Sequence, residues 1–114
     1  MKKYLLLYSI VSILFASFGC RTEHPLPDCV REKIRQVMQE PVRNPPAEVW
    51  QYDFEGRKVY FIPEYCCDMF SELLDENCAV ICAPDGGIAG HGDGKCPEFF
   101  SLRKNGILIW QDKR

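Results

Sequence analysis

Cysteine is the residue type in this chain with the clearest chemistry. Seven cysteines occur in 114 residues, and five of them lie in one stretch, at Cys66, Cys67, Cys78, Cys82 and Cys96. This density is typical of small secreted domains stapled by disulfides. Thiol–disulfide redox chemistry is the alternative, with Cys66–Cys67 or Cys78–Cys82 as the working pair. Neither pair has the Cys-x-x-Cys spacing that lowers a thiol pKa, so structural bridges are favoured.

A glycine-rich loop separates the last two cysteines. Residues 83–95 read Ala-Pro-Asp-Gly-Gly-Ile-Ala-Gly-His-Gly-Asp-Gly-Lys. Helix or strand would be entropically costly there, whereas turns with positive φ suit glycine. We predict a folded loop, closed covalently, whose aspartates accept hydrogen bonds from nearby backbone N–H groups. The candidate binding residues are Asp85, Gly86, Gly87, Gly90, Gly92, Asp93 and Gly94.

Other ligand chemistries fit this loop less well. It resembles one copy of a GGxGxD calcium repeat, but the spacing differs and such repeats bind by stacking. The loop also lacks the alternating carboxylates of an EF-hand. The segment Ile81–Gly86 resembles part of the Kazal inhibitor motif, without its downstream residues. We therefore expect no cofactor and no metal, with a calcium module or an inhibitor of secreted hydrolases as alternatives.

Enzymatic catalysis is not expected. A nucleophilic mechanism needs a nucleophile, a base and a group that orients the base. His91 is the only histidine after residue 24, and Ser71 and Ser101 lie in no recognisable nucleophile motif. We predict a binding or structural module.

The first 19 residues have the pattern of a lipoprotein signal peptide. A basic start precedes the apolar run Tyr4–Ala16, which is shorter than the ~20 residues of a membrane span. Gly19-Cys20 resembles a lipobox, in which the cysteine becomes acylated, although Ser17 and Phe18 depart from that pattern. Assigning Cys20 to a lipid anchor leaves six cysteines, an even number for disulfides.

The predicted address is the bacterial cell envelope, on the periplasmic or surface face of the outer membrane. Residues 20–27 contain two prolines and no apolar periodicity, and they form a tether to one domain at 28–114. The formal net charge of −2 gives no reason to expect nucleic acid. The expected partners are the membrane, through the anchor, and an unknown protein or glycan.

The first half of the domain has clear secondary-structure signals. Val30, Ile34, Val37 and Met38 recur at helical spacing, which predicts a helix over 28–39 that ends before Pro41. Aromatic and β-branched runs at 49–54 and 57–62 flank a turn that contains Gly56, which predicts an antiparallel hairpin.

The second half is predicted from shorter segments. The spacing of Phe70, Leu73 and Leu74 predicts a short helix in 66–74, and the apolar run 78–83 predicts a buried strand. Asn105-Gly106 predicts a hairpin turn between 99–102 and 107–110. Six cysteines, Cys29 with the five of the cysteine-rich stretch, allow 15 connectivities. We favour a bridge from Cys29 to Cys66 or Cys67.

These elements predict a small α+β domain with a helix on an antiparallel sheet. The double cysteine at 66–67, the Gly-rich loop ending in Gly92-Asp93-Gly94-Lys95-Cys96, and the terminal Ile109-Trp110-Gln111-Asp112 resemble a family of small uncharacterised lipoproteins from Bacteroidota. The resemblance covers most of the chain after Cys20. It implies one folded unit at the envelope and supplies no activity.

Overall fold

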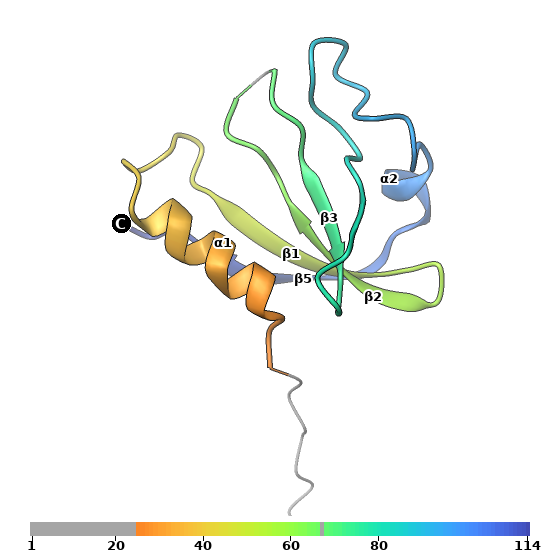
Figure 1. Cartoon of the computed structure of the whole chain (residues 1–114), viewed down its shortest axis with the longest axis horizontal. Coiled ribbons are helices and arrows are strands. Elements are labelled where there is room, and N and C mark those ends of the chain that lie inside the picture. Colours follow the sequence, from red (N-terminus) through yellow and green to blue (C-terminus); the bar gives the residue numbers. More distant parts are fainter. Residues whose placement is uncertain (1–24, 67) are drawn as a thin grey trace, which may run out of the picture.

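Two helices and a five-stranded antiparallel sheet make up the described part of the chain (Figure 1). The computed structural model describes residues 25–66 and 68–114. The elements are α1 (Asp28–Met38), β1 (Glu48–Phe54), β2 (Arg57–Ile62), β3 (Glu72–Asp75), β4 (Val80–Cys82), α2 (Phe99–Leu102) and β5 (Lys104–Gln111). The strand order is β4-β3-β2-β1-β5. The α+β prediction is confirmed, and no helix in the described part is long and apolar enough to span a membrane.

Helix α1 covers one face of the sheet, as its apolar spacing predicts. Val30 and Val37 are buried. Val30 belongs to a hydrophobic cluster between the helix and the sheet, and Ile34 packs against this cluster. From the sheet, this cluster contains Val49, Tyr60, Ile62 and Leu74. Pro27 precedes the first turn, where its missing N–H costs nothing.

The β1–β2 hairpin is confirmed at the predicted positions. Glu55 and Gly56 in the turn both have positive φ, of 50° and 75°, the geometry that matches the twist of the flanking strands. Tyr52 and Phe54 pack edge-to-face against the buried Phe99 of α2, with ring centroids 5.7 and 5.3 Å apart. The aromatic side of β1 therefore builds a second core on the face opposite α1.

The predicted helix over 66–74 is wrong, because residues 72–75 form β3. Leu73 pairs with Phe61 and Leu74 with Tyr60 in an antiparallel register. The two adjacent leucines enter opposite faces of the sheet, and both are buried. A short apolar run is compatible both with a helix and with a strand that is buried on both faces. The sequence pattern alone therefore could not distinguish the two structures.

The predicted hairpin at Asn105-Gly106 is also wrong. Phe99–Leu102 is the short helix α2, and both turn residues lie inside the continuous strand β5. Gln51 pairs with Ile107 but Asp53 pairs with Lys104, so β5 carries one extra residue at this point. Asn105 has φ of 52° there. The Asn-Gly sequence thus forms a β-bulge in an edge strand, a feature that blunts edge-to-edge pairing.

The strand predicted over 78–83 is shorter and less buried than expected. Strand β4 contains Val80–Cys82, and Val80 is 66% exposed on the sheet edge while Cys82 is buried. Cys78 belongs to the β3–β4 turn and has φ of 66°.

Two disulfides cross-link the described part. Cys82 bonds to Cys96, and Cys29 bonds to Cys78. The expected bridge from Cys29 to Cys66 or Cys67 is therefore wrong. The start of α1 lies near the β3–β4 turn (Figure 1), whereas the β2–β3 loop that carries Cys66 lies at the other end of the sheet. Cys67 and Cys20 lie outside the described residues.

Candidate binding surface at the loop end

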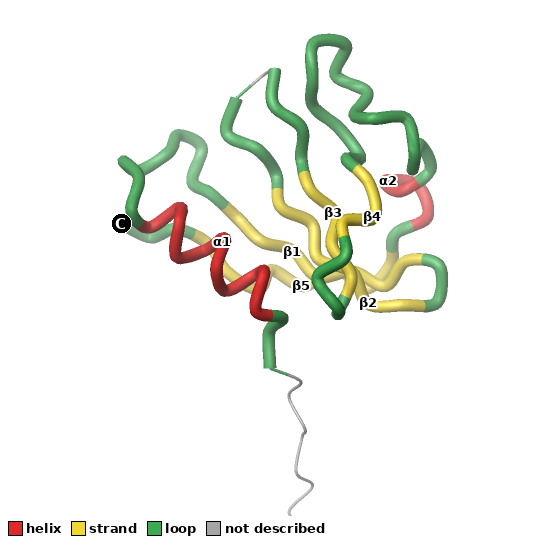
Figure 2. The backbone as a smooth tube through the Cα atoms, viewed as in Figure 1, coloured by secondary structure: helices red, strands yellow, loops and turns green. Residues whose placement is uncertain are grey.

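Three long connections meet at one end of the sheet, which we call the loop end (Figure 2). They are the α1–β1 connection (39–47), the β2–β3 loop (63–71) and the segment 83–98 that contains the Gly-rich loop. The Arg43 guanidinium lies 5.3 Å from the centre of the Tyr65 ring, and this contact joins the α1–β1 connection to the β2–β3 loop. Phe70 and Gly86 form an antiparallel bridge, which joins the last two.

The Gly-rich loop is folded by its own hydrogen bonds. Gly92 N–H donates to the Gly86 carbonyl at 3.0 Å, and Asp93 N–H donates to the Ala83 carbonyl at 3.0 Å. Gly90 N–H donates to the Gly87 carbonyl, and Gly87 N–H donates to the Met69 carbonyl. The loop therefore presents a defined backbone rather than a solvated linker, as the sequence predicts.

The glycines hold backbone conformations that other residues adopt at a cost. All five have positive φ between 66° and 89°: Gly86, Gly87, Gly90, Gly92 and Gly94. At Gly86 and Gly92 the backbone of a nearby segment also leaves no space for a side chain. A Cβ on Gly86 would lie 2.0 Å from the Met69 carbonyl oxygen, and one on Gly92 would lie 1.9 Å from that of Ala83.

The two loop aspartates act differently. The Asp93 carboxylate accepts the Lys95 N–H at 3.0 Å, and this bond holds the pKa of Asp93 below its usual value. The contacts described for Asp85 are made by its main chain with Ser71, a buried residue that sequence reasoning left without a role. The Ser71 hydroxyl donates to the Asp85 carbonyl and accepts the Asp85 N–H, both at 3.1 Å.

Apolar side chains are exposed on the Gly-rich loop and on the β2–β3 loop beside it. Ile88 is 96% exposed, and Tyr65, Met69 and Phe70 are each about half exposed. We call these four residues the loop-end patch. A cavity of about 350 Å³ adjoins Ile88 and is lined by Phe70, Gly86, Gly87 and Gly92 among others. A protruding apolar side chain beside a preformed hollow is typical of a protein-binding surface.

This geometry does not favour the two alternative chemistries, metal binding and thiol–disulfide redox. Among the described residues, no group of three or more His, Cys, Asp or Glu side chains could hold a metal ion. The Cys78–Cys82 pair is not a redox couple, because each of these cysteines is bonded to another partner. Cys66 is exposed.

Two ion pairs made by Lys33 join α1 to the base of the loop end. Lys33 Nζ lies 3.3 Å from Glu64 and 3.4 Å from Glu72. Burial alone would lower the pKa of Lys33, but the two carboxylates outweigh it and raise the pKa. The Lys33–Glu64 pair holds the start of the β2–β3 loop against the helix.

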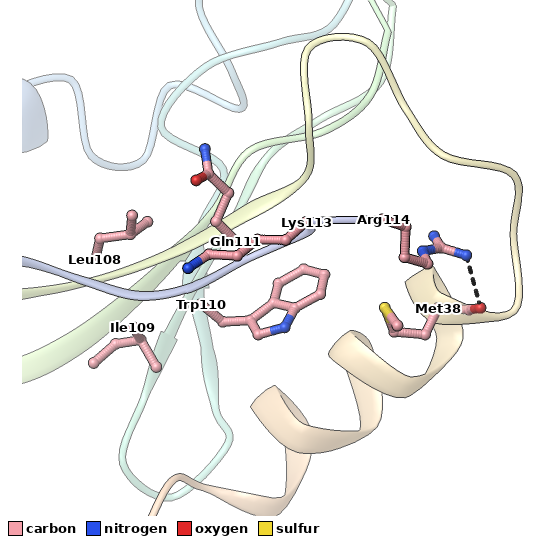
Figure 3. Close-up of a pocket in the computed structure, with 7 residues that line it drawn as sticks. All are labelled: Met38, Leu108, Ile109, Trp110, Gln111, Lys113 and Arg114. Atoms are coloured by element: carbon pink, nitrogen blue, oxygen red, sulfur yellow. Dashed lines mark hydrogen bonds between the residues drawn. The ribbon is translucent and has the colours of Figure 1, made fainter.

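The C-terminal residues have a structural role that the sequence analysis missed. Arg114 donates to the Met38 carbonyl at the end of α1 at 3.1 Å (Figure 3). It also donates to the Val37 and Glu40 carbonyls, at 3.2 and 3.0 Å. The buried Asp112 holds this guanidinium at 2.8 Å, and hydrogen bonds from Arg114 lower the pKa of Asp112. Arg114 thus caps α1, where a cation is favoured by the helix dipole.

A groove of about 510 Å³ lies between α1 and β5 beside this cap. Its lining contains Met38, Ile109 and Trp110, and the last two both lie on the α1 side of β5 (Figure 3). The adjacent residues Ile109 and Trp110 lie on the same side of β5 because the β1–β5 register shifts between Val49 and Trp50.

Comparison with known proteins identifies the family. No curated protein and no solved structure matches the chain. A family described as Domain of unknown function (DUF6970) matches residues 35–112, which include the loop end and all five strands of the sheet. This range covers more than half of the sequence, so the chain belongs to the family Domain of unknown function (DUF6970).

Proposed function

We propose that this protein is a lipid-anchored, non-enzymatic binding module of the bacterial cell envelope. Cys20 is the attachment site for the lipid, and the loop-end patch contacts a protein partner. The lipobox-like Gly19-Cys20 and the resemblance to lipoproteins from Bacteroidota support the anchor. One observation carries the binding role: Ile88, almost fully exposed, stands on a backbone fixed by hydrogen bonds and the Cys82–Cys96 bridge.

The layout of the fold supports this proposal. The described chain begins beside the β3–β4 turn, and the loop end lies at the opposite end of the sheet (Figure 1). A domain tethered at its first residues would direct the loop-end patch away from the anchoring membrane. The patch would then meet a partner in the adjoining compartment.

Site-directed photo-crosslinking in cells that natively carry the protein tests the binding role. A photoreactive phenylalanine analogue replaces Phe70 in one variant and Val80, an exposed edge-strand residue, in the control. We expect a discrete adduct from position 70 only, and we expect Ile88→Ser to abolish it, because Ile88 supplies the most exposed apolar surface. Equal adducts from both positions, or an adduct that survives Ile88→Ser, would refute the proposal.

A further inference from the structure

The loop end carries the whole formal side-chain charge of the described part of the chain. Its three connections contain two basic residues, Arg43 and Lys95, and six acidic ones, which are Glu40, Glu64, Asp68, Asp85, Asp93 and Glu98. The rest of the described part holds nine acidic and nine basic side chains, so it is formally neutral. The loop end stays acidic even without Glu64, which pairs with Lys33. Such an asymmetry attracts partners of opposite charge, so the loop end favours a basic partner.

The cavity beside Ile88 is the hollow at this end that can receive a side chain. Its volume is about 350 Å³. Three of its lining residues, Gly86, Gly87 and Gly92, have no side chain, so this part of the wall is backbone. The same backbone is fixed by the hydrogen bonds of the Gly-rich loop. A partner side chain can therefore enter a preformed hollow, which lowers the entropic cost of binding.

The Phe70 ring is a fixed aromatic wall of this cavity. A Cβ on Gly87 would lie 2.6 Å from a ring carbon of Phe70, so the ring packs directly against the glycine backbone. The main chain of Phe70 is held by its bridge to Gly86. Phe70 is nevertheless 51% exposed. An accessible aromatic ring attracts a cation through its quadrupole and stacks well with a flat guanidinium.

Asp68 supplies the one charged side chain of the cavity lining. It is exposed, and within residues 25–66 and 68–114 no cation pairs with it. An anionic group of a ligand would be repelled by this carboxylate, whereas a cationic group would be attracted. The aromatic ring and the carboxylate therefore favour the same kind of ligand group, a cation.

Arginine matches this combination better than lysine does. Its aliphatic stem can contact Ile88 while its planar guanidinium stacks on Phe70 and donates two parallel hydrogen bonds to the Asp68 carboxylate. The lysine ammonium is compact and strongly hydrated, and it cannot stack on a ring. Arginine is also enriched among the residues that dominate protein interfaces.

We propose that the partner of the loop-end patch inserts an arginine side chain into this cavity, with the guanidinium between the Phe70 ring and the Asp68 carboxylate. This inference rests on the proposed binding role and adds the chemistry of the partner, which is a basic protein segment. The acidic loop end attracts the segment, and the cavity holds its arginine.

Backbone-amide NMR on the full chain in detergent tests the cavity without the natural partner. The probes are N-acetylarginine methylamide and N-acetylcitrulline methylamide, which have nearly the same shape but differ in charge. We expect the arginine probe to shift the amide signals of Gly86, Gly87 and Gly92, and the citrulline probe to bind about fivefold more weakly. Equal binding of the two probes, or shifts that leave out these glycines, would overturn the assignment.

Asp68→Asn and Glu55→Gln are a matched pair of variants. Each removes one exposed carboxylate and keeps the shape of the side chain, but Glu55 lies in the β1–β2 turn, at the other end of the strands. Asp68→Asn should weaken binding of the arginine probe about threefold, whereas Glu55→Gln should leave it unchanged. Melting temperatures verify that both variants are folded. Unchanged binding to folded Asp68→Asn would refute the assignment.

Photo-crosslinking from Tyr65 separates this inference from the proposed binding role. Tyr65 is about half exposed, and a photoreactive phenylalanine analogue there leaves Asp68 and Phe70 intact. We expect an adduct whose yield falls in Asp68→Asn but not in Glu55→Gln, and whose crosslinked segment contains an arginine. An adduct that Asp68→Asn leaves unchanged would refute the arginine while the binding role stands. Absence of adducts from both position 65 and position 70 would refute both.

Discussion

Replacing Gly92 by alanine places a methyl carbon 1.9 Å from the Ala83 carbonyl oxygen, where side-chain carbons essentially never approach closer than 3.0 Å. The loop must then move. Movement there breaks the hydrogen bonds from Gly92 N–H to Gly86 and from Asp93 N–H to Ala83, each of which contributes about 1 kcal/mol. The left-handed backbone adds about 1 kcal/mol more for a residue with a Cβ. We expect Gly92→Ala to destabilise the protein by roughly 3 kcal/mol.

Gly90 and Gly94 are matched controls in the same loop. Their φ of 74° is similar to that of Gly92, but a Cβ at either position meets nothing within 4 Å. Alanine at these sites should therefore cost only the backbone term, about 1 kcal/mol. For a domain of this size, 1 kcal/mol shifts the melting temperature by about 4–8 °C.

Thermal melts of the three variants measure the difference. Gly92→Ala should lower the melting temperature by roughly 12 °C or more, and Gly90→Ala and Gly94→Ala by about a third of that shift. Equal shifts at Gly90 and Gly92 would show that the close approach to Ala83 contributes nothing. Three neutral variants would show that the loop is not folded as described.

Three further predictions concern the anchor, the bridges and the helix cap. Cys20→Ala should move the protein from the membrane to the soluble fraction, and a variant that stays membrane-bound without lipid mass contradicts the anchor. Alkylation without reductant, read by intact mass, should label no cysteine after Cys20, and any labelled site contradicts complete pairing. Asp112→Asn should lower the melting temperature at pH 7. The pKa of Asp112 is lower in the folded protein than its ordinary value of about 3.9. The ionised carboxylate therefore stabilises the fold above that ordinary value, and this stabilisation is lost as the pH falls below it. Melts at pH 7 and pH 2.5 should accordingly show that the difference in melting temperature between Asp112→Asn and wild type shrinks in acid. A difference that is unchanged in acid would show that ionised Asp112 does not hold the cap.

Local signals predict the parts of this fold that are decided locally. The α1 periodicity and the β1–β2 turn were sufficient because each element carries its own pattern and its own end signals. The folded glycine-rich loop was likewise predictable, because closely spaced glycines disfavour helix and strand and suit turns with positive φ.

The errors occur where distant contacts decide the conformation. Leu73 and Leu74 form a strand because cores on both faces of the sheet receive them, and neither core is visible in the local sequence. Asn105-Gly106 becomes a bulge because β1 is long enough to pair along the whole of β5. The Cys29–Cys78 bridge depends on the end of the sheet at which α1 begins, a property of the assembled fold.

The candidate binding residues of the loop end were only partly predictable. The aspartates and glycines were identified from composition, whereas the exposure of Ile88 and Phe70 follows from the backbone path around them. Arg43 carries no sequence signal, because an arginine among prolines ordinarily indicates a solvated connector. Its burial under Tyr65 arises from the meeting of two connections that are distant in the chain.

The Cys29–Cys78 bridge also determines how the domain would respond to mechanical pulling on the proposed lipid anchor. Tension applied at Cys20 would extend about 30 Å of chain before it reached Cys29. From there the covalent bridge would carry the load directly to the β3–β4 turn, so α1 could not unwind from its first residue. Force from the membrane would thus enter the sheet at the end remote from the loop-end patch, and the proposed binding surface would keep its shape while the tether is taut.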